Sequence, residues 1–184
     1  MQCFFDTFSN IDLFTLSLDH HQDKTQCAHC LKNNQFISHG IIYKQTSMTE
    51  RKPVGKRIIC SNRYSRSGCG RTIQLYVANR IPRLHYDASV VFAFISHLLA
   101  EVCVIQAYQQ ATGQFEARNA WRWLSKLMRQ LSAYRGTLVA RTHSLIEHHS
   151  RRLRLLLPTL TQMISNANPS LCARYQVNHQ RSFM

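Results

Sequence analysis

Residues 60–71 read CSNRYSRSGCGR, in which two cysteines stand nine positions apart in an otherwise polar, basic and glycine-containing stretch. Such a pair is either half of a metal site or two unrelated thiols in a loop. An earlier pair, CAHC at 27–30, has the C-x-x-C spacing that lets two thiolates reach one ion from a tight turn. The segments around the two pairs therefore have to decide between the two interpretations.

Three β-like segments lie between and after the cysteine pairs. Residues 35–44 (QFISHGIIYK) and 55–60 (GKRIIC) enclose a loop with proline and glycine, and residues 71–77 (RTIQLYV) alternate in polarity. The order of cysteine turn, strand, hairpin, strand, cysteine turn and strand is that of a zinc ribbon, whose two turns bind one tetrahedral ion. We therefore predict a small three-stranded sheet with a metal site at one end.

The predicted ligands of one structural Zn²⁺ ion are four thiolates: Cys27, Cys30, Cys60 and Cys69. A closed four-thiolate site leaves no open position for a substrate, which is why the ion is predicted to be structural. The second pair departs from the regular spacing, since eight residues separate its cysteines, but Gly68 and Gly70 stand where a tight backbone turn is needed. His29 and His39 are alternative ligands, and two unrelated thiols remain the alternative to a second turn.

The second half of the chain has helical periodicity. Residues 88–102 are almost entirely apolar, residues 104–113 end in a glycine, and residues 116–131 are amphipathic. The predicted buried stripe of this last segment is Ala117, Ala120, Trp121, Leu124, Leu127, Met128 and Leu131. Helix, short helix, glycine turn and basic helix is the order of a helix-turn-helix; the alternative is a bundle with a solvated basic face.

Charge is distributed in blocks. The chain has 23 Lys and Arg against 9 Asp and Glu, for a net charge of +14, which favours a polyanionic partner. Residues 24–83 and 118–184 are basic and flank a near-neutral segment, whereas residues 1–23 have four aspartates and no lysine or arginine. This pattern fits two modules that face double-stranded DNA.

The predicted DNA contacts fall in both modules. Base edges are assigned to the start of the basic helix and phosphates to its later cations: Arg118, Asn119 and Arg122, then Lys126 and Arg129. Mostly phosphate-directed contacts are assigned to the ribbon: Arg51, Lys52, Lys56, Arg57, Arg63 and Arg66.

Several function classes are disfavoured. No run approaches the roughly 18 apolar residues of a membrane span, and the N-terminus has acids where an export signal needs bases. An odd number of cysteines, seven, argues against a disulfide scaffold. Beyond the ribbon only Asp87, Glu101, Glu116 and Glu147 are acidic, too few and too poorly placed for a metal-dependent transposase. We therefore expect a non-catalytic protein in the cytoplasm.

The C-terminal region predicts one more helix that stops near Pro158, a short final helix around residues 160–164, and weak order in the last fifteen or so residues. The stretch RRLRLLLP at 151–158 fits contact with phosphates or an oligomer or partner interface. The apolar, acidic N-terminal segment fits docking on the basic body or on another protein.

The chain resembles the zinc-ribbon plus helix-turn-helix proteins of bacterial insertion sequences and the DNA-binding regions of transposases. The shared features are CAHC, GKRIIC, GCGRTIQLY and a helix ending in AWRWLSKL. The ribbon also resembles small phage late-gene activators with stretched cysteine spacing. The resemblance implies an α+β fold, element ends or promoters as ligands, and a non-catalytic role near the bacterial nucleoid.

The predicted organisation is an N-terminal segment (1–23), a zinc ribbon (24–83), a helix-turn-helix (84–131), and C-terminal helices with a tail (132–184). Two functions remain open at this point. The first is a DNA-binding protein of a mobile element that assists or regulates transposition or recombination. The second is an adaptor that recruits a transposase, recombinase or RNA polymerase, with DNA binding secondary.

Overall fold

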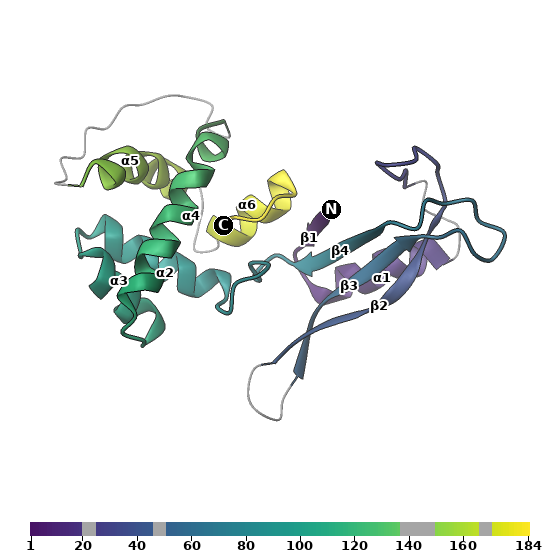
Figure 1. Cartoon of the computed structure of the whole chain (residues 1–184), viewed down its shortest axis with the longest axis horizontal. Coiled ribbons are helices and arrows are strands. Elements are labelled where there is room, and N and C mark those ends of the chain that lie inside the picture. Colours follow the sequence, from purple (N-terminus) through teal and green to yellow (C-terminus); the bar gives the residue numbers. More distant parts are fainter. Residues whose placement is uncertain (20–24, 46–50, 137–149, 166–170) are drawn as a thin grey trace. The chain divides into compact units, whose positions relative to one another are not determined.

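The computed structural model describes residues 1–19, 25–45, 51–136, 150–165 and 171–184 (Figure 1). The fold is α+β, as predicted, with a mixed sheet and helices. The chain divides into two units, and each is described by itself. The sheet unit is Met1–Pro82 with Gln176–Arg181, and the helical unit is Arg83–Tyr175 with Ser182–Met184.

The sheet has four strands in the order β1-β4-β3-β2, so the prediction of three strands was wrong. Strands β2 (Phe36–Gln45), β3 (Arg51–Cys60) and β4 (Thr72–Val77) are antiparallel neighbours, in the predicted order. The additional strand β1 (Gln2–Phe5) comes from the N-terminal segment and pairs in parallel with β4. It covers the β4 edge, whose unpaired backbone groups would otherwise be exposed.

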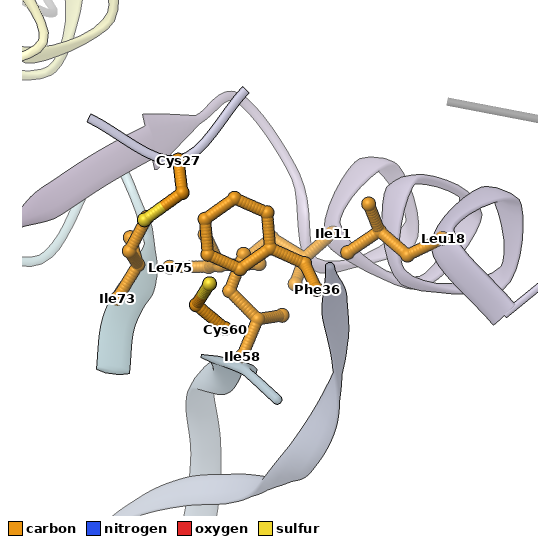
Figure 2. Packing of buried hydrophobic residues seen from close by; sticks show 8 residues of the cluster. All are labelled: Ile11, Leu18, Cys27, Phe36, Ile58, Cys60, Ile73 and Leu75. Carbon is orange, nitrogen blue, oxygen red and sulfur yellow. The ribbon is translucent and has the colours of Figure 1, made fainter. Parts of the chain in front are cut away.

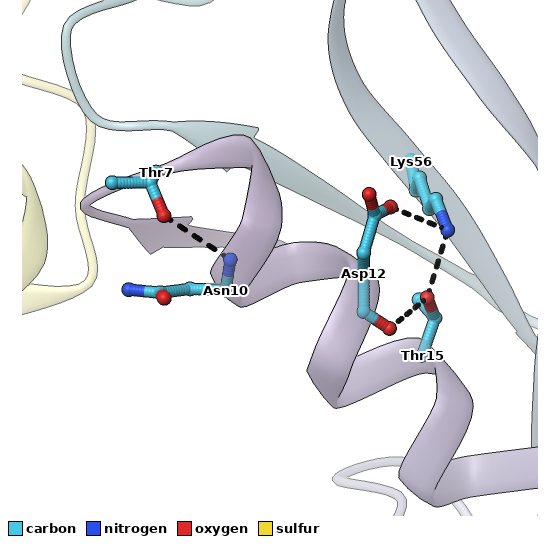
Figure 3. Close-up of polar contacts among 5 residues, drawn as sticks. All are labelled: Thr7, Asn10, Asp12, Thr15 and Lys56. Carbon is cyan, nitrogen blue, oxygen red and sulfur yellow. Dashed lines mark hydrogen bonds and ion pairs between the residues drawn. The ribbon is translucent and has the colours of Figure 1, made fainter.

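Helix α1 (Phe8–Asp19) packs against β2, β3 and β4, so the N-terminal segment docks on the sheet. Its buried side chains join an apolar core that reaches the cysteines: Ile11, Leu18, Cys27, Phe36, Ile58, Cys60, Ile73 and Leu75 (Figure 2). Lys56 on β3 reaches back to α1, where its Nζ lies 2.8 Å from Asp12 Oδ1 and donates to Thr15 Oγ1 at 2.9 Å (Figure 3).

Strand β3 begins four residues before the predicted strand, within the expected loop and ahead of Pro53. Before Gly55 the strand has β2 as its one described neighbour, and Pro53 therefore stands at an edge position, where a proline is tolerated. Gly55 itself is required by the sheet, because a Cβ there would collide with the Leu75 carbonyl of β4. The glycine permits close approach of β3 and β4 at the residue where their pairing begins.

The helical unit contains the three predicted helices with small boundary shifts: α2 (Ala88–Leu99), α3 (Val104–Thr112) and α4 (Ala117–Gly136). Helix α3 packs against both α2 and α4. Gly113 caps α3 in the left-handed conformation, with φ of 72°, and its N–H donates to the Gln109 carbonyl at 2.8 Å. A glycine reverses the chain here because a left-handed C-cap strains residues that carry a Cβ.

One residue of the predicted buried stripe on α4 was wrong. Trp121 is 44% exposed, whereas Trp123 is 4% exposed and lies at the centre of an aromatic cluster. The Trp123 ring makes edge contacts with Tyr86, Phe94 and Tyr108, at centroid distances of 5.4, 5.4 and 5.1 Å. The buried face of α4 is thus rotated toward Trp123, and the space between α2 and α3 selected the tryptophan that fits it.

The C-terminal predictions also need correction. Helix α5 (Arg151–Ser165) runs through Pro158 instead of stopping there and packs on α4 and α2. Buried leucines on both sides of the proline hold the helix together: Leu153, Leu156, Leu157 and Leu160. Residues 138–149 of the predicted helix lie outside the described residues.

The last residues form helix α6 (Leu171–His179), where weak order was predicted. In the helical unit Tyr175 and Phe183 are buried against Tyr134, whose hydroxyl donates to the Phe183 carbonyl. In the sheet unit the Gln180 side-chain amide accepts from Phe4 N–H at 2.8 Å and donates to Phe4 O at 2.9 Å, so it pairs with β1 as a further strand would.

Candidate metal centre and basic helix face

The four predicted ligands, Cys27, Cys30, Cys60 and Cys69, lie together, with their sulfurs within 4.8 Å of one another. The sulfur separation is 3.7 Å between Cys27 and Cys69 and 3.6 Å between Cys30 and Cys60. A tetrahedral ion with metal–sulfur bonds of about 2.3 Å places its ligands about 3.8 Å apart. The four thiols could therefore hold one metal ion with little movement.

The first cysteine turn is closed by two backbone hydrogen bonds. Leu31 N–H donates to the Cys27 carbonyl at 2.8 Å, and Cys27 N–H donates to the Lys32 carbonyl at 3.0 Å. Leu31, directly after the second cysteine, has a φ of 56°, in the left-handed region. A short antiparallel bridge between Gln26 and Asn33 fixes the ends of the turn.

The second cysteine turn repeats this hydrogen-bond pattern despite its different length. Gly70 N–H donates to the Cys60 carbonyl at 2.7 Å, and Cys60 N–H donates to the Arg71 carbonyl at 2.9 Å. Gly70, directly after the second cysteine, has a φ of 76° and corresponds to Leu31. When residues 62–67 are left out, the second stretch reads CSGCGR and aligns with CAHCLK, and the hydrogen-bonded residues then occupy the same positions in both turns.

Residues 62–67, here called the turn insert, leave and rejoin the turn at one point. Gly68 N–H donates to the Ser61 carbonyl at 2.7 Å, which brings together the two residues that flank the insert. Ser61 and Gly68 thus occupy the two central positions of a regular C-x-x-C turn. The enlarged spacing is an insertion into a regular turn, and it leaves the arrangement of the four cysteines intact.

Gly68 is the more crowded of the two glycines in this turn. A Cβ there would lie 2.7 Å from the Cys60 sulfur and 2.7 Å from the Cys60 carbonyl carbon, and closer still to the Ser61 oxygen. These separations are far inside van der Waals contact. Gly70 is different, because its positive φ is the demand and a Cβ would meet open space.

The surroundings shift the pKa values of two of the cysteine thiols in opposite directions. Burial raises the pKa of Cys60 to about 12. Burial also acts to raise the pKa of Cys27, but backbone N–H groups of Cys30 and His29 donate to its sulfur and lower the pKa to about 7. The amide donors thus favour the Cys27 thiolate, whereas burial disfavours ionisation of Cys60. A bound cation would stabilise the negative charge on all four sulfurs.

The two alternative ligands, His29 and His39, are not part of this cluster. Among the described residues, the group that could hold a metal ion consists of the four cysteines. The exposed His29 ring instead lies beside Arg71, with Nε2 3.4 Å from a guanidinium nitrogen. His39 is exposed at a bulge of β2.

The cations assigned to the sheet unit fall into two groups. Arg51, Lys52, Arg57 and Arg63 are exposed. Lys56 and Arg66 are half-buried and engaged within the unit. The Lys56 ammonium pairs with Asp12, and the Arg66 guanidinium donates to the carbonyls of Asn34 at 2.6 Å and Phe36 at 3.0 Å. These two side chains have a structural task that sequence reasoning did not anticipate.

The basic residues of α4 lie together on its outer face. Arg118, Arg122 and Arg129 are exposed, and Lys126 is half-buried. Asn119 is held from both sides: its amide donates to Glu116, and its carbonyl accepts from Arg122 at 3.3 Å. The network orients the Arg122 guanidinium at the start of the helix.

Exposed aromatic side chains add to this face and were missed at the sequence level. Trp121, next to Arg122 in the chain, is 44% exposed, and Phe115 in the preceding turn is 73% exposed. The helical stripe alone could not separate the exposed Trp121 from the buried Trp123.

No protein-family model, curated protein or solved structure matches the chain. Across the residues that the structure describes, every helix is too short or too polar to cross a lipid bilayer. The functional assignment therefore depends on the cysteine cluster and on the surfaces of the two units.

Proposed function

We propose that the chain is a zinc-containing, non-catalytic DNA-binding protein of a mobile genetic element. It binds element ends, a promoter or target DNA and thereby assists or regulates transposition or recombination. The observation that carries the proposal is the outside of α4, which presents three exposed arginines and an exposed tryptophan: Arg118, Arg122, Arg129 and Trp121. The link to a mobile element rests on the order of the two modules and on the motifs named above.

Helix α4 acts as the recognition helix in this proposal. It follows a short helix and a glycine turn, and its buried side is fixed by Trp123, Leu124 and Leu127. An α-helix fits the major groove, with its first residues nearest the base edges. Arg122, oriented by Asn119, is suited to a bidentate contact with guanine. Arg129, two turns later, is suited to a phosphate.

Zinc is the metal that the four-thiolate set favours. Thiolates select soft or borderline ions, and a closed tetrahedron of four cysteines is typical of a structural zinc site. Because Cys27 and Cys60 belong to the core of the sheet unit, loss of the ion would disturb that core as well as the turns. The zinc thus supports the surface on which the exposed cations of the sheet unit stand.

Binding to selected DNA tests the proposal. A random duplex library is selected with the zinc-loaded full chain, and the recovered site is compared with the element's own termini in a mobility-shift assay. Arg122→Ala should relax the sequence preference and cost about 1–3 kcal/mol. Arg129→Ala should weaken binding to all sequences and reduce the salt slope by about one. Arg174→Ala, an exposed cation outside the proposed face, is the control.

A combined variant gives the decisive result. The four cations of α4 are replaced by alanine together: Arg118, Arg122, Lys126 and Arg129. If this variant, folded and zinc-loaded, binds the selected duplex as tightly as the parent, the DNA-binding role of α4 is wrong.

The adaptor function is the second candidate, and one observation favours it. Leu13 and Leu16 on α1 are 66% and 53% exposed and lie one turn apart. Exposed leucines on a docked helix are typical of a protein contact. The combined α4 variant separates the two functions, because an adaptor would retain its protein partner when DNA binding is lost.

A further inference from the structure

The turn insert, residues 62–67, is not needed to hold the metal. Both cysteine turns are closed by the same pair of backbone hydrogen bonds, and Ser61 and Gly68 are bonded to each other across the base of the insert. A chain that ran directly from Ser61 to Gly68 would read CSGCGR and match CAHCLK position for position. The insert therefore has to be explained by something other than ligation.

The base of the insert is fixed by contacts to the chain that leaves the first cysteine turn. The Arg66 guanidinium donates to the carbonyls of Asn34 and Phe36. Lys32 Nζ donates to the Ser67 carbonyl at 2.7 Å, and Ser67 N–H donates to Gln35 Oε1 at 2.7 Å. These bonds join the two cysteine turns and hold the insert in one orientation.

The tip of the insert presents polar and aromatic side chains to solvent. Asn62, Arg63, Tyr64 and Ser65 are all exposed, and Tyr64 is 81% exposed, the largest value among the exposed large hydrophobic residues of the described chain. Residues 60–71 contain no acid. Asn, Arg, Tyr and Ser are side-chain types that contact phosphate oxygens on DNA.

The backbone at the tip is held in an uncommon conformation. Arg66 N–H donates to the Arg63 carbonyl at 3.1 Å, which closes a tight turn whose central residues are Tyr64 and Ser65. Their φ angles are 55° and 61°. Turns with two central residues in the left-handed region usually carry Asn and Gly. The left-handed conformation is unfavourable for a tyrosine backbone, and strained residues of this kind often have a functional side chain. We therefore expect the exposed Tyr64 side chain to have a role.

We propose that the turn insert is a DNA-contact loop, in which the Arg63 guanidinium and the Tyr64 hydroxyl bind phosphates of the duplex. The assignment rests on the proposed DNA-binding function and adds a contact that the metal turn holds in place. Zinc acts on this contact indirectly, because the ion fixes the two residues from which the insert departs.

Deletion of the insert tests both parts of the inference in the full-length chain. The Δ62–67 variant should bind one zinc, since its turn becomes a regular C-x-x-C. Its binding to a mixed-sequence 30-bp duplex should weaken, and the slope of log affinity against log salt should fall by about one, for the loss of Arg63. Loss of zinc by this variant would overturn the claim that the insert is dispensable for ligation.

Point variants keep the DNA contact testable even when the deletion does not fold. Arg63→Ala should reduce the salt slope by about one, and Tyr64→Phe should weaken binding without changing the slope, because only an uncharged hydroxyl is lost. Arg181→Ala, an exposed cation of the sheet unit outside the insert, is the matched control.

The outcomes separate this inference from the proposed function. If the parent does not bind the duplex, the proposed function fails and the loop assignment fails with it. If the parent binds and zinc-loaded Arg63→Ala and Tyr64→Phe both bind with its affinity and slope, the DNA-contact loop is wrong and the proposed function stands.

Discussion

Replacing Gly68 by alanine adds one methyl group at the most crowded position of the candidate metal centre. The new Cβ would lie 2.7 Å from the Cys60 sulfur and against the Ser61 carbonyl oxygen. Both neighbours are fixed, because Cys60 is fully buried and Ser61 holds the bond that closes the insert. The methyl group can be accommodated only if the second turn opens.

The expected loss follows from the cost of an extra methyl group in a packed site, about 1–3 kcal/mol. The strain exists only in the folded turn, whose formation is coupled to metal binding. We therefore expect the zinc affinity of Gly68→Ala to fall by about 5- to 150-fold, with one tenfold step for each 1.4 kcal/mol. Direct displacement of the Cys60 sulfur would place the result at the upper end.

Competition with a chromophoric chelator at neutral pH measures the affinity, and two glycine variants serve as controls. Gly70→Ala faces open space but keeps a positive φ, so its loss should be smaller, about 1 kcal/mol. Gly136→Ala, at the end of α4 with nothing near its Cβ, should leave zinc binding unchanged. If Gly68→Ala binds zinc within twofold of the parent, the crowded-turn geometry is wrong.

Three further outcomes are expected. Removal of the metal with EDTA should unfold the sheet unit, as measured by circular dichroism. The Cys103→Ser variant, changed in the helical unit, should still bind one zinc per chain, and loss of zinc in it would contradict the four-cysteine site. Lys56→Met should lower the free energy of unfolding by about 0.5–1.5 kcal/mol, but it should not change the salt slope of DNA binding, because Asp12 already neutralises the ammonium; a reduced slope would make Lys56 a DNA contact. In Trp123→Phe, where Trp121 is the remaining tryptophan, duplex DNA should quench the fluorescence and protect it from iodide, and an unchanged spectrum speaks against α4 as the contact surface.

Much of the fold was available from local patterns. The alternation in RTIQLYV and the apolar runs around the cysteine pairs predicted three of the strands, since side chains of a half-buried strand alternate between faces. The three central helices were predicted within a few residues, because Gly113 and the apolar spacing mark helix ends and faces. The cysteine set was also predicted, because its spacing and flanking glycines reflect local turn geometry.

Long-range packing decided what the sequence left open. Nothing in QCFF identifies β4 as its partner, because parallel pairing joins segments about seventy residues apart. Trp121 and Trp123 lie two positions apart on one helix, and only the space among Tyr86, Phe94 and Tyr108 determines which ring is buried. The C-terminal helix α6 likewise packs on a residue far away in the sequence, since its Tyr175 ring lies edge-on against Tyr134.

The second cysteine turn separates what the sequence determined from what only the tertiary structure determined. The sequence alone determined that Cys60 and Cys69 bound a basic loop and that glycines flank Cys69, and that pattern was enough to predict a metal pair. Only the tertiary structure decided that Ser61 and Gly68 meet, that residues 62–67 leave the turn as a unit, and that Arg66 anchors them. Covalent spacing limits how far two ligands can separate, but it does not fix which backbone groups bond across a loop. That choice belongs to the segments packed around it.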